Sequence, residues 1–269
     1  MPRIAVTSDI HLGITSLPRV MQLISDIRKT KPDAAVIAGD IGEGVENIEL
    51  VLDEFKRLQI PVAACAGNHD VWNHDKKTPS ERVWTSMLPK IAKCTDTTWL
   101  ESENLILGEV AIVGSTAWYD YSAQDPSFRS TPDETRLRKA EFDADAWMCD
   151  WPWTDIEFCK MIEPGFRERL RSAQDNSDVK KIIVVTHSPI FEEQIKRKPG
   201  NFKWGFSNAY YGNLTFGEIV KEFNKVKLAV AGHTHAGMEG AADASGRLIR
   251  AVTLDSQYND PIFNIINRV

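Results

Sequence analysis

The first third of the chain alternates short apolar runs with longer amphipathic segments. Residues 4–7, 34–38 and 61–64 are mainly apolar, whereas residues 17–29 and 45–58 repeat their apolar positions at helical spacing. Short apolar runs are typical of buried strands, and an apolar stripe with a period of about 3.6 residues is typical of a helix packed on a sheet. The alternation therefore predicts a βαβαβ unit with parallel strands.

Further strand and helix patterns occur along the rest of the chain. Two Thr-Pro-x-Glu sequences, which begin at Thr78 and Thr131, combine a hydroxyl N-cap with proline and glutamate at favourable positions, so each predicts the start of a helix. The last two strand-like runs suggest an antiparallel pair that closes the sheet. The predicted strands are residues 105–107, 111–113, 182–186, 228–231, 248–253 and 262–266.

Two segments interrupt this pattern. Residues 115–180 contain helices and loops rich in tryptophan, and we expect a cap over a site there. Residues 189–212 mix basic and aromatic residues, and we expect a mobile lip. The tryptophans could stack on an aromatic group of a substrate, but buried tryptophan more often fills a core. Because no linker or internal repeat divides the chain, we predict one domain over residues 1–269.

The composition is typical of a soluble globular protein, since 42% of the 269 residues are hydrophobic and 26% are charged. The apolar runs are far shorter than the ~20 residues of a membrane helix, so we expect no membrane contact. The N-terminal residues lack a secretory pattern and the four cysteines lack CxxC spacing, which favours a cytoplasmic protein. The net charge of -6 argues against a broad nucleic-acid surface.

The histidines are placed unevenly. Five of the six directly follow an apolar run, and His74 is the exception. Asp9 and His11 are two residues apart, as are His233 and His235, so in extended backbone the side chains of each pair can point the same way. Ligands of open α/β sheets gather beyond the carboxyl ends of the strands. We therefore expect the residues at these strand ends to converge.

Three of the strand ends read Ala-Gly followed by a candidate ligand, which is Asp40, Asn68 or His233. Glycine there lets the backbone turn sharply and approach an ion. Imidazole, carboxylate and amide donors suit manganese, iron or zinc, and the lack of a thiolate cluster disfavours a structural zinc. The donors suffice for two cations about 3.5 to 4 Å apart. Taken singly, Asn68 could be an ordinary turn residue.

Together, Asp9-Ile10-His11, Gly39-Asp40, Gly67-Asn68-His69-Asp70, His187 and Gly232-His233-Thr234-His235 resemble the calcineurin-like metallophosphoesterase family. The resemblance extends from residue 9 to residue 235. As a set the motifs are specific, although each fragment alone is weak. The resemblance implies an α/β fold, a four-layer α/β/β/α sandwich of two mixed β-sheets flanked by helices.

The same resemblance implies two divalent or trivalent transition-metal ions whose ligand sets share Asp40. A hydroxide bridging the ions would attack phosphorus in line, His69 would protonate the leaving oxygen, and Asp70 would orient His69. A structural role for His69 is the alternative. One ligand set would be Asp9, His11, Asp40 and His235, and the other Asp40, Asn68, His187 and His233.

Departures from the motifs of two subfamilies narrow the class of substrate that we expect. The residues after Asp40 are Ile41-Gly42-Glu43 and not the Val-Asp-Arg-Gly of protein serine/threonine phosphatases, and the tyrosine ligand of purple acid phosphatases is missing. The motifs are similar to those of bacterial phosphodiesterases, including the class that acts on cyclic nucleotides, which favours a small-molecule phosphodiester. The alternatives are a metal-dependent nuclease, disfavoured by the acidic charge, and a non-catalytic scaffold, disfavoured because every expected position is filled. The oligomeric state stays open.

Overall fold

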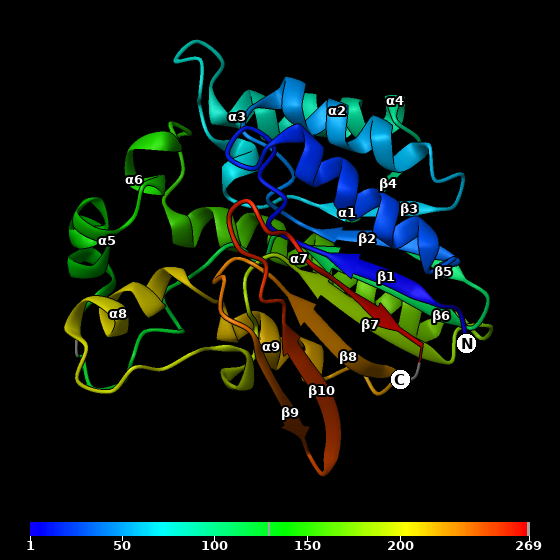
Figure 1. The fold of residues 1–269 in the computed structure, drawn as a ribbon. Coiled ribbons are helices and arrows are strands. Elements are labelled where there is room, and N and C mark those ends of the chain that lie inside the picture. Colours follow the sequence, from blue (N-terminus) through cyan, green and yellow to red (C-terminus); the bar gives the residue numbers. More distant parts are fainter. Residues whose placement is uncertain (129, 268–269) are drawn as a thin grey trace.

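The computed structural model describes residues 1–128 and 130–267. Two mixed β-sheets pack face to face and helices cover the outer face of each, so the fold is a four-layer α/β/β/α sandwich (Figure 1). This arrangement confirms the predicted fold class. Within the described ranges, no helix combines the length and the apolar character needed to cross a bilayer.

The first sheet contains the predicted βαβαβ unit. β1 (Ile4–Thr7), β2 (Ala34–Ala38) and β3 (Val62–Cys65) pair in parallel. β4 (Thr97–Trp99) extends the sheet beyond β3, and β11 (Phe263–Ile266) pairs antiparallel with β1 at the other edge. The helices over its outer face are α1 (Leu17–Lys29), α2 (Val45–Lys56) and α4 (Leu88–Cys94), drawn at the top of Figure 1.

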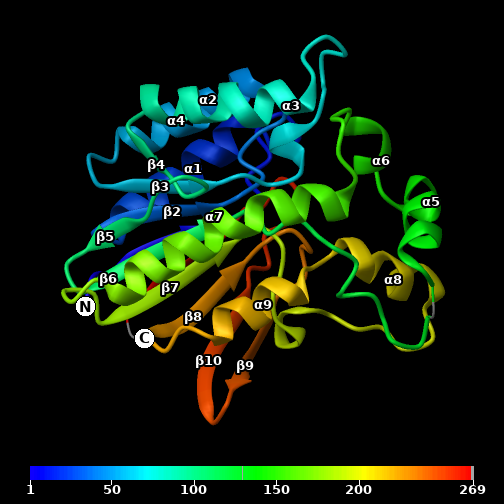
Figure 2. The same cartoon turned by 180° about the vertical axis from the view of Figure 1, so that it is seen from behind.

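The second sheet has the order β5-β6-β7-β8-β10-β9. Its four middle strands are parallel, and β5 and β9 are antiparallel edges. Figure 2 shows α7 (Asp155–Asp175) and α9 (Leu214–Lys221) on the outer face of this sheet. The strands are β5 (Leu105–Leu107), β6 (Val110–Ser115), β7 (Lys181–Thr186), β8 (Val226–Ala231), β9 (Met238–Ala244) and β10 (Arg247–Thr253).

Side chains alternate between two apolar layers along the central strands. Ile4 of β1 and Ile183 of β7 belong to the core between the two sheets. Their neighbours Ala5 and Ile182 belong instead to the cores beneath the helices. Because both faces of these strands are buried, their sequences read as continuous apolar runs and not as apolar-polar alternation.

The chain between β6 and β7 divides into two parts. α5 (Pro132–Phe142) and α6 (Asp145–Met148) project beyond the sheets, whereas α7 packs on the second sheet (Figures 1 and 2). The expected capping box at Thr131 starts α5, and a second one at Thr154 starts α7. α8 (Phe202–Ser207), from residues 189–212, lies against α5.

Aromatic side chains join this projecting part to α7. The rings of Trp118, Trp151 and Trp153 lie with their centroids 5.5, 4.2 and 5.7 Å from the ring of Phe158. Trp147 is 56% exposed and stands apart from that cluster. Three of the four tryptophans therefore fill an apolar core, which is the ordinary role of buried tryptophan.

One expected strand pairing is wrong, and one strand was missed. Residues 248–253 and 262–266 do not pair, because β10 pairs with β8 and β9 while β11 joins β1 in the other sheet. β9 was not predicted because its sequence, Met-Glu-Gly-Ala-Ala-Asp-Ala, lacks a clear apolar period. The helix expected from Thr78 is present, but it begins at Ser80 (α3, Ser80–Arg82) with Pro79 at its N-cap, and the Thr78 hydroxyl donates to Asp75 at 2.9 Å.

Candidate metal centre

The predicted site residues follow strands of both sheets. The carboxyl ends of the parallel strands meet at one edge of the sandwich, near the centre of Figure 1. The structure brings all nine predicted residues to this edge. Asp9 and His11 follow β1, Asp40 follows β2, Asn68, His69 and Asp70 follow β3, His187 follows β7, and His233 and His235 follow β8.

The backbone is strained at five of these positions. Asp9, His11, Asp40, His233 and His235 have φ angles of 53°, 47°, 51°, 70° and 47°. L-residues other than glycine rarely adopt this left-handed region, and such strain gathers at functional sites. The strained turns at the strand ends therefore determine where these side chains point.

Asp9, His11 and His235 form the first group of donors. One donor atom from each lies within 4.8 Å of the others. The Nδ1 atom of His235 faces the carbonyl oxygen of Ser256 at 2.7 Å, which leaves its Nε2 atom directed toward Asp9 at 4.0 Å. The backbone N–H of His233 donates to Asp9 at 2.8 Å and fixes that carboxylate.

Asp40, His187 and His233 form the second group, whose donor atoms also lie within 4.8 Å of one another. The Oδ1 atom of Asn68 lies 2.9 Å from Nε2 of His187 and 3.0 Å from Nδ1 of His233. Contacts with backbone carbonyl oxygens fix the two imidazoles, Ala38 for His187 at 2.9 Å and Tyr210 for His233 at 2.8 Å. The second group therefore converges on the amide oxygen of Asn68.

Asp40, a member of the second group, also contacts the first. Its Oδ2 atom is 3.3 Å from Nε2 of His11 and 3.4 Å from Nε2 of His187. Burial alone would raise the pKa of the Asp40 carboxyl, but the charges of His187, His69 and His11 outweigh burial and hold that pKa well below its usual value. An ionised carboxylate between two nitrogen-rich groups has the position that a bridging ligand requires.

The donor set fits metal ions for two further reasons. The Nε2 atom of His11 is buried and makes no hydrogen bond with the described residues, although Oδ2 of Asp40 lies 3.3 Å away. Nδ1 of His233 and Nε2 of His187 lie only 3.1 Å apart. A buried nitrogen without a hydrogen bond is costly, and a bound cation would satisfy it, while the closely spaced imidazole nitrogens could bind a cation together. Without thiolates, the set suits manganese, iron or zinc.

Two glycines allow the loops to approach the donors. A Cβ atom on Gly39, whose φ angle is +79°, would lie 2.5 Å from Nδ1 of His187. A Cβ atom on Gly67 would overlap Oδ1 of Asp40. The predicted role of glycine at these strand ends therefore has a steric explanation, because any side chain would displace a donor.

His69 lies beside the two groups and contacts Glu43, which was not among the predicted site residues. Oε1 of Glu43 lies 2.8 Å from Nδ1 of His69 and 2.9 Å from Nδ1 of His11. The ring of Trp72 stacks on His69 with centroids 3.5 Å apart. Burial lowers the pKa of His69, but the charges of Asp40 and Glu43 dominate and raise it to about 9. His69 is thus held in one orientation by Glu43 and Trp72 and is protonated at neutral pH.

Asp70 does not lie against the imidazole of His69, contrary to the expectation that it orients that ring. Its carboxylate accepts hydrogen bonds from the backbone N–H groups of Ile41 (2.8 Å), Gly42 (3.2 Å) and Gly67 (2.8 Å). Burial raises the pKa of Asp70 to about 7. Asp70 therefore joins the loops after β2 and β3, and Glu43 makes the contact expected of Asp70.

Sequence reasoning missed two carboxylates at the site. Glu43 comes three residues after Asp40 in the same loop, so its closeness to a candidate ligand was a usable signal. Asp145 of α6 accepts a hydrogen bond from Nδ2 of Asn68 at 3.0 Å, although 77 residues separate the two. No local pattern predicts a contact of that kind.

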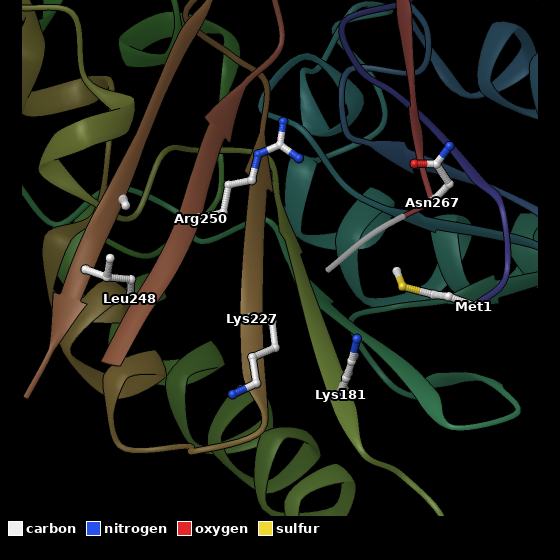
Figure 3. Close-up of a pocket in the computed structure, with 7 residues that line it drawn as sticks. Met1, Lys181, Lys227, Leu248, Arg250 and Asn267 are labelled. Carbon is white, nitrogen blue, oxygen red and sulfur yellow. The ribbon is translucent and has the colours of Figure 1, made fainter. Parts of the chain in front are cut away.

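A separate pocket of about 590 Å³ lies at the opposite ends of the same strands (Figure 3). Lys181 is the first residue of β7 and Lys227 the second of β8, whereas the donors follow the other ends of these strands. Since none of the histidines lines this pocket, it is distinct from the candidate site. Its lining includes Met1, Lys181, Lys227, Leu248, Arg250 and Asn267.

Comparisons with known proteins agree with this geometry. The family model described as calcineurin-like phosphoesterase matches residues 2–237. The sequence has no significant match among curated proteins. Among solved structures, a phosphopantetheinyl hydrolase from Mycobacterium tuberculosis aligns with a TM-score of 0.71 and 19% identity over 98% of this chain and 95% of that one. A dimetal phosphatase from Danio rerio aligns with a TM-score of 0.54 and 12% identity over 95% and 88%. Both share the fold.

Proposed function

This chain belongs to the calcineurin-like phosphoesterase family, and we propose that it hydrolyses a phosphodiester with two metal ions held at the candidate metal centre. The family identifies it as a metal-dependent phosphoesterase. The observation that supports a dinuclear centre is the position of Asp40, whose Oδ2 atom lies within 3.4 Å of an imidazole nitrogen from each group. The proposed ligands are Asp9, His11, Asp40, Asn68, His187, His233 and His235.

Manganese, iron and zinc are the proposed metals, because the donors are imidazole, carboxylate and amide oxygen. When bound, the two ions would supply an activated water nucleophile and neutralise negative charge on the phosphoryl group. The protein contributes fixed donors, because backbone groups and Glu43 hold the imidazoles in place. Such outer contacts select the tautomer and the orientation of each ligand.

We assign the role of general acid to His69. The contact with Glu43 engages Nδ1, so Nε2 is the nitrogen that can pass a proton to the leaving oxygen. Stacking on Trp72 limits rotation of the ring. Proton transfer to the leaving group matters most when the departing alcohol is a poor leaving group, as in natural phosphodiesters.

Residues 115–180 and 189–212 are proposed to enclose the substrate side of the centre. Asp145 from the first segment binds Asn68, and the carbonyl oxygen of Tyr210 from the second binds His233. Both segments therefore contact proposed ligands directly.

The absence of CxxC spacing supports a cytoplasmic location as part of this proposal.

A panel of esters tests which diester this chain hydrolyses. The mycobacterial neighbour is named as a phosphopantetheinyl hydrolase, and a phosphopantetheinyl group joined to an alcohol is a phosphodiester. Cyclic nucleotides belong in the panel because of the motif likeness, and a short single-stranded oligonucleotide tests the nuclease alternative. The net charge of -6 makes the oligonucleotide the weaker candidate.

Metal removal is expected to abolish hydrolysis of a bis-aryl phosphodiester, and adding back Mn²⁺, Fe²⁺ or Zn²⁺ should restore it. The measurement is kcat/KM for the diester and for the matching aryl monoester, before chelation, after chelation and after reconstitution. Lys227→Ala, at the opposite ends of the strands, is the control and should behave as the unchanged protein. Full activity after exhaustive chelation would contradict the metal mechanism, and faster hydrolysis of the monoester would contradict the diester preference.

Metal uptake is expected to release protons near pH 7. Burial lowers the pKa of His187, but the charges of Asp40 and Asp9 outweigh burial and raise it to about 9, so the metal-free imidazole is protonated at pH 7. A cation must displace that proton, so affinity should rise with pH until about pH 9. Calorimetric titration in buffers of different ionisation enthalpy measures the released protons. Proton-neutral binding at pH 7 would count against His187 as a ligand.

A further inference from the structure

Asn68 can serve the second group of donors only if its side-chain amide is turned the right way. An amide has an accepting end and a donating end, and only the oxygen can coordinate a cation. In the structure, Oδ1 faces His187 at 2.9 Å and His233 at 3.0 Å. The Nδ2 end therefore needs an acceptor on the opposite side.

Asp145, on α6 of the projecting part, supplies that acceptor. Its Oδ1 atom accepts hydrogen bonds from Nδ2 of Asn68 at 3.0 Å and from Nε1 of Trp72 at 2.6 Å. Its Oδ2 atom accepts from the hydroxyl of Tyr119 at 2.7 Å. The residue is 1% exposed, so water does not compete for these bonds.

We propose that Asp145 is a positioning residue that sets the orientation of the Asn68 amide and makes the projecting part of the chain a component of the metal centre. An ionised carboxylate only accepts hydrogen bonds, so it binds the NH₂ end of the amide and rejects the oxygen end. A reversed amide would place two oxygens together in a buried site and would leave the metal side with a donor. Both consequences are unfavourable.

The Asp145 carboxylate is also connected to the proposed acid, His69, through Trp72. Trp72 donates to Asp145 and stacks on His69, whose ring centroid is 3.5 Å from its own. One side chain from α6 thus restrains a proposed metal ligand and the ring that packs against the proton carrier. This inference rests on the proposed function, since a positioned ligand has meaning only if the centre binds metal.

The test compares three variants with the unchanged protein. Asp145→Leu removes the acceptor while filling the space. Asp145→Asn retains all three contacts, because its oxygen can accept from Asn68 and Trp72 while its NH₂ group donates to the Tyr119 hydroxyl. The control is Asp150→Leu, which makes the same exchange of carboxylate for leucine in the same part of the chain and removes the bonds that Asp150 accepts from Nδ2 of Asn73 at 2.6 Å and from the backbone N–H of Ser80 at 2.8 Å. Neither of these bonds involves Asp145 or a proposed ligand.

Competition with a chromophoric chelator measures the affinity for each of two Mn²⁺ ions, and electron paramagnetic resonance detects spin coupling between them. We expect Asp145→Leu to weaken one ion by roughly 10- to 100-fold and to lose the coupled spectrum at stoichiometric manganese. Asp145→Asn and the control should keep both affinities. Thermal unfolding of the metal-free proteins checks that all are folded.

The outcomes separate this inference from the proposed function. If the unchanged protein binds fewer than two ions, the proposed function fails first. If it binds two and Asp145→Leu binds them equally well, or if the control loses as much affinity, the positioning role is overturned. Should Asp145→Leu not fold, a crystal structure of the manganese-loaded protein decides, because an amide of Asn68 turned away from Asp145 refutes the assignment.

Discussion

Replacing Asp40 by alanine is expected to lower kcat/KM by roughly 10³-fold or more and to remove the paired metal centre. The Asp40 carboxylate contacts imidazole nitrogens of both groups, His11 at 3.3 Å and His187 at 3.4 Å. Stabilisation of the transition state by metal ions amounts to several kcal/mol, and each 1.36 kcal/mol corresponds to about a tenfold change in rate. Activity and metal content by elemental analysis are the two measurements.

Two further variants show whether charge or shape causes that loss. Asp40→Asn keeps an acceptor for the backbone N–H of His69, which donates to Oδ1 at 2.9 Å, but removes the charge. We expect it to lose most of the activity as well, because a neutral amide bridges cations poorly. Asp53→Ala, on the exposed side of α2, is the matched control and should retain both metal and activity. Normal turnover by Asp40→Ala would remove the basis of the dinuclear assignment.

The second large effect is expected from His69→Gln. Positioned acids contribute about 10²- to 10⁴-fold, so kcat for a diester with an alkyl leaving group should fall by that factor. For an aryl diester with a good leaving group the decrease should be much smaller, because departure of that group needs little proton transfer. Metal content should stay unchanged, since the proposed ligand set does not include His69.

The dependence on the leaving group separates an acid from a merely structural residue. A structural defect would slow alkyl and aryl diesters alike, and it would appear as metal loss or a lower unfolding temperature. Glu43→Gln is a second variant, because it keeps a side chain next to Nδ1 of His69 but removes one of the two charges, Asp40 and Glu43, that raise the pKa of His69. Its metal content must be measured too, since Glu43 also contacts His11. An equal decrease for both leaving groups in His69→Gln would argue for the structural alternative.

Most of the candidate site could be predicted from the residues that follow the apolar strands. Parallel strands buried on both faces leave apolar runs in the sequence, and the residue after each run must lie at one edge of the sandwich. That is why Asp9, Asp40, His187 and His233 could be placed together before any coordinates. Glycine before a donor was also readable, because Gly39 and Gly67 leave no room for a side chain.

The features that the sequence did not predict depend on contacts between distant parts of the chain. The bond between Asn68 and Asp145 spans 77 residues and crosses from a strand end to a short helix. The edge strand β11 was assigned the wrong neighbour because apolar character indicates that a strand is buried but does not indicate which sheet receives it. Asp70 was given the wrong neighbour for a similar reason, since a carboxylate beside His69 in sequence can point into the adjacent loop.

The donors come from both halves of the sandwich, with Asp9, Asp40 and Asn68 on one sheet and His187, His233 and His235 on the other. Two bound metal ions would therefore link the two sheets, and any unfolding that separates the sheets must first release the ions. A ligand at a free concentration about a hundredfold above its Kd raises the free energy of unfolding by about 2.7 kcal/mol. The supply of metal would then affect how long the protein resists proteases, in addition to how fast it hydrolyses substrate.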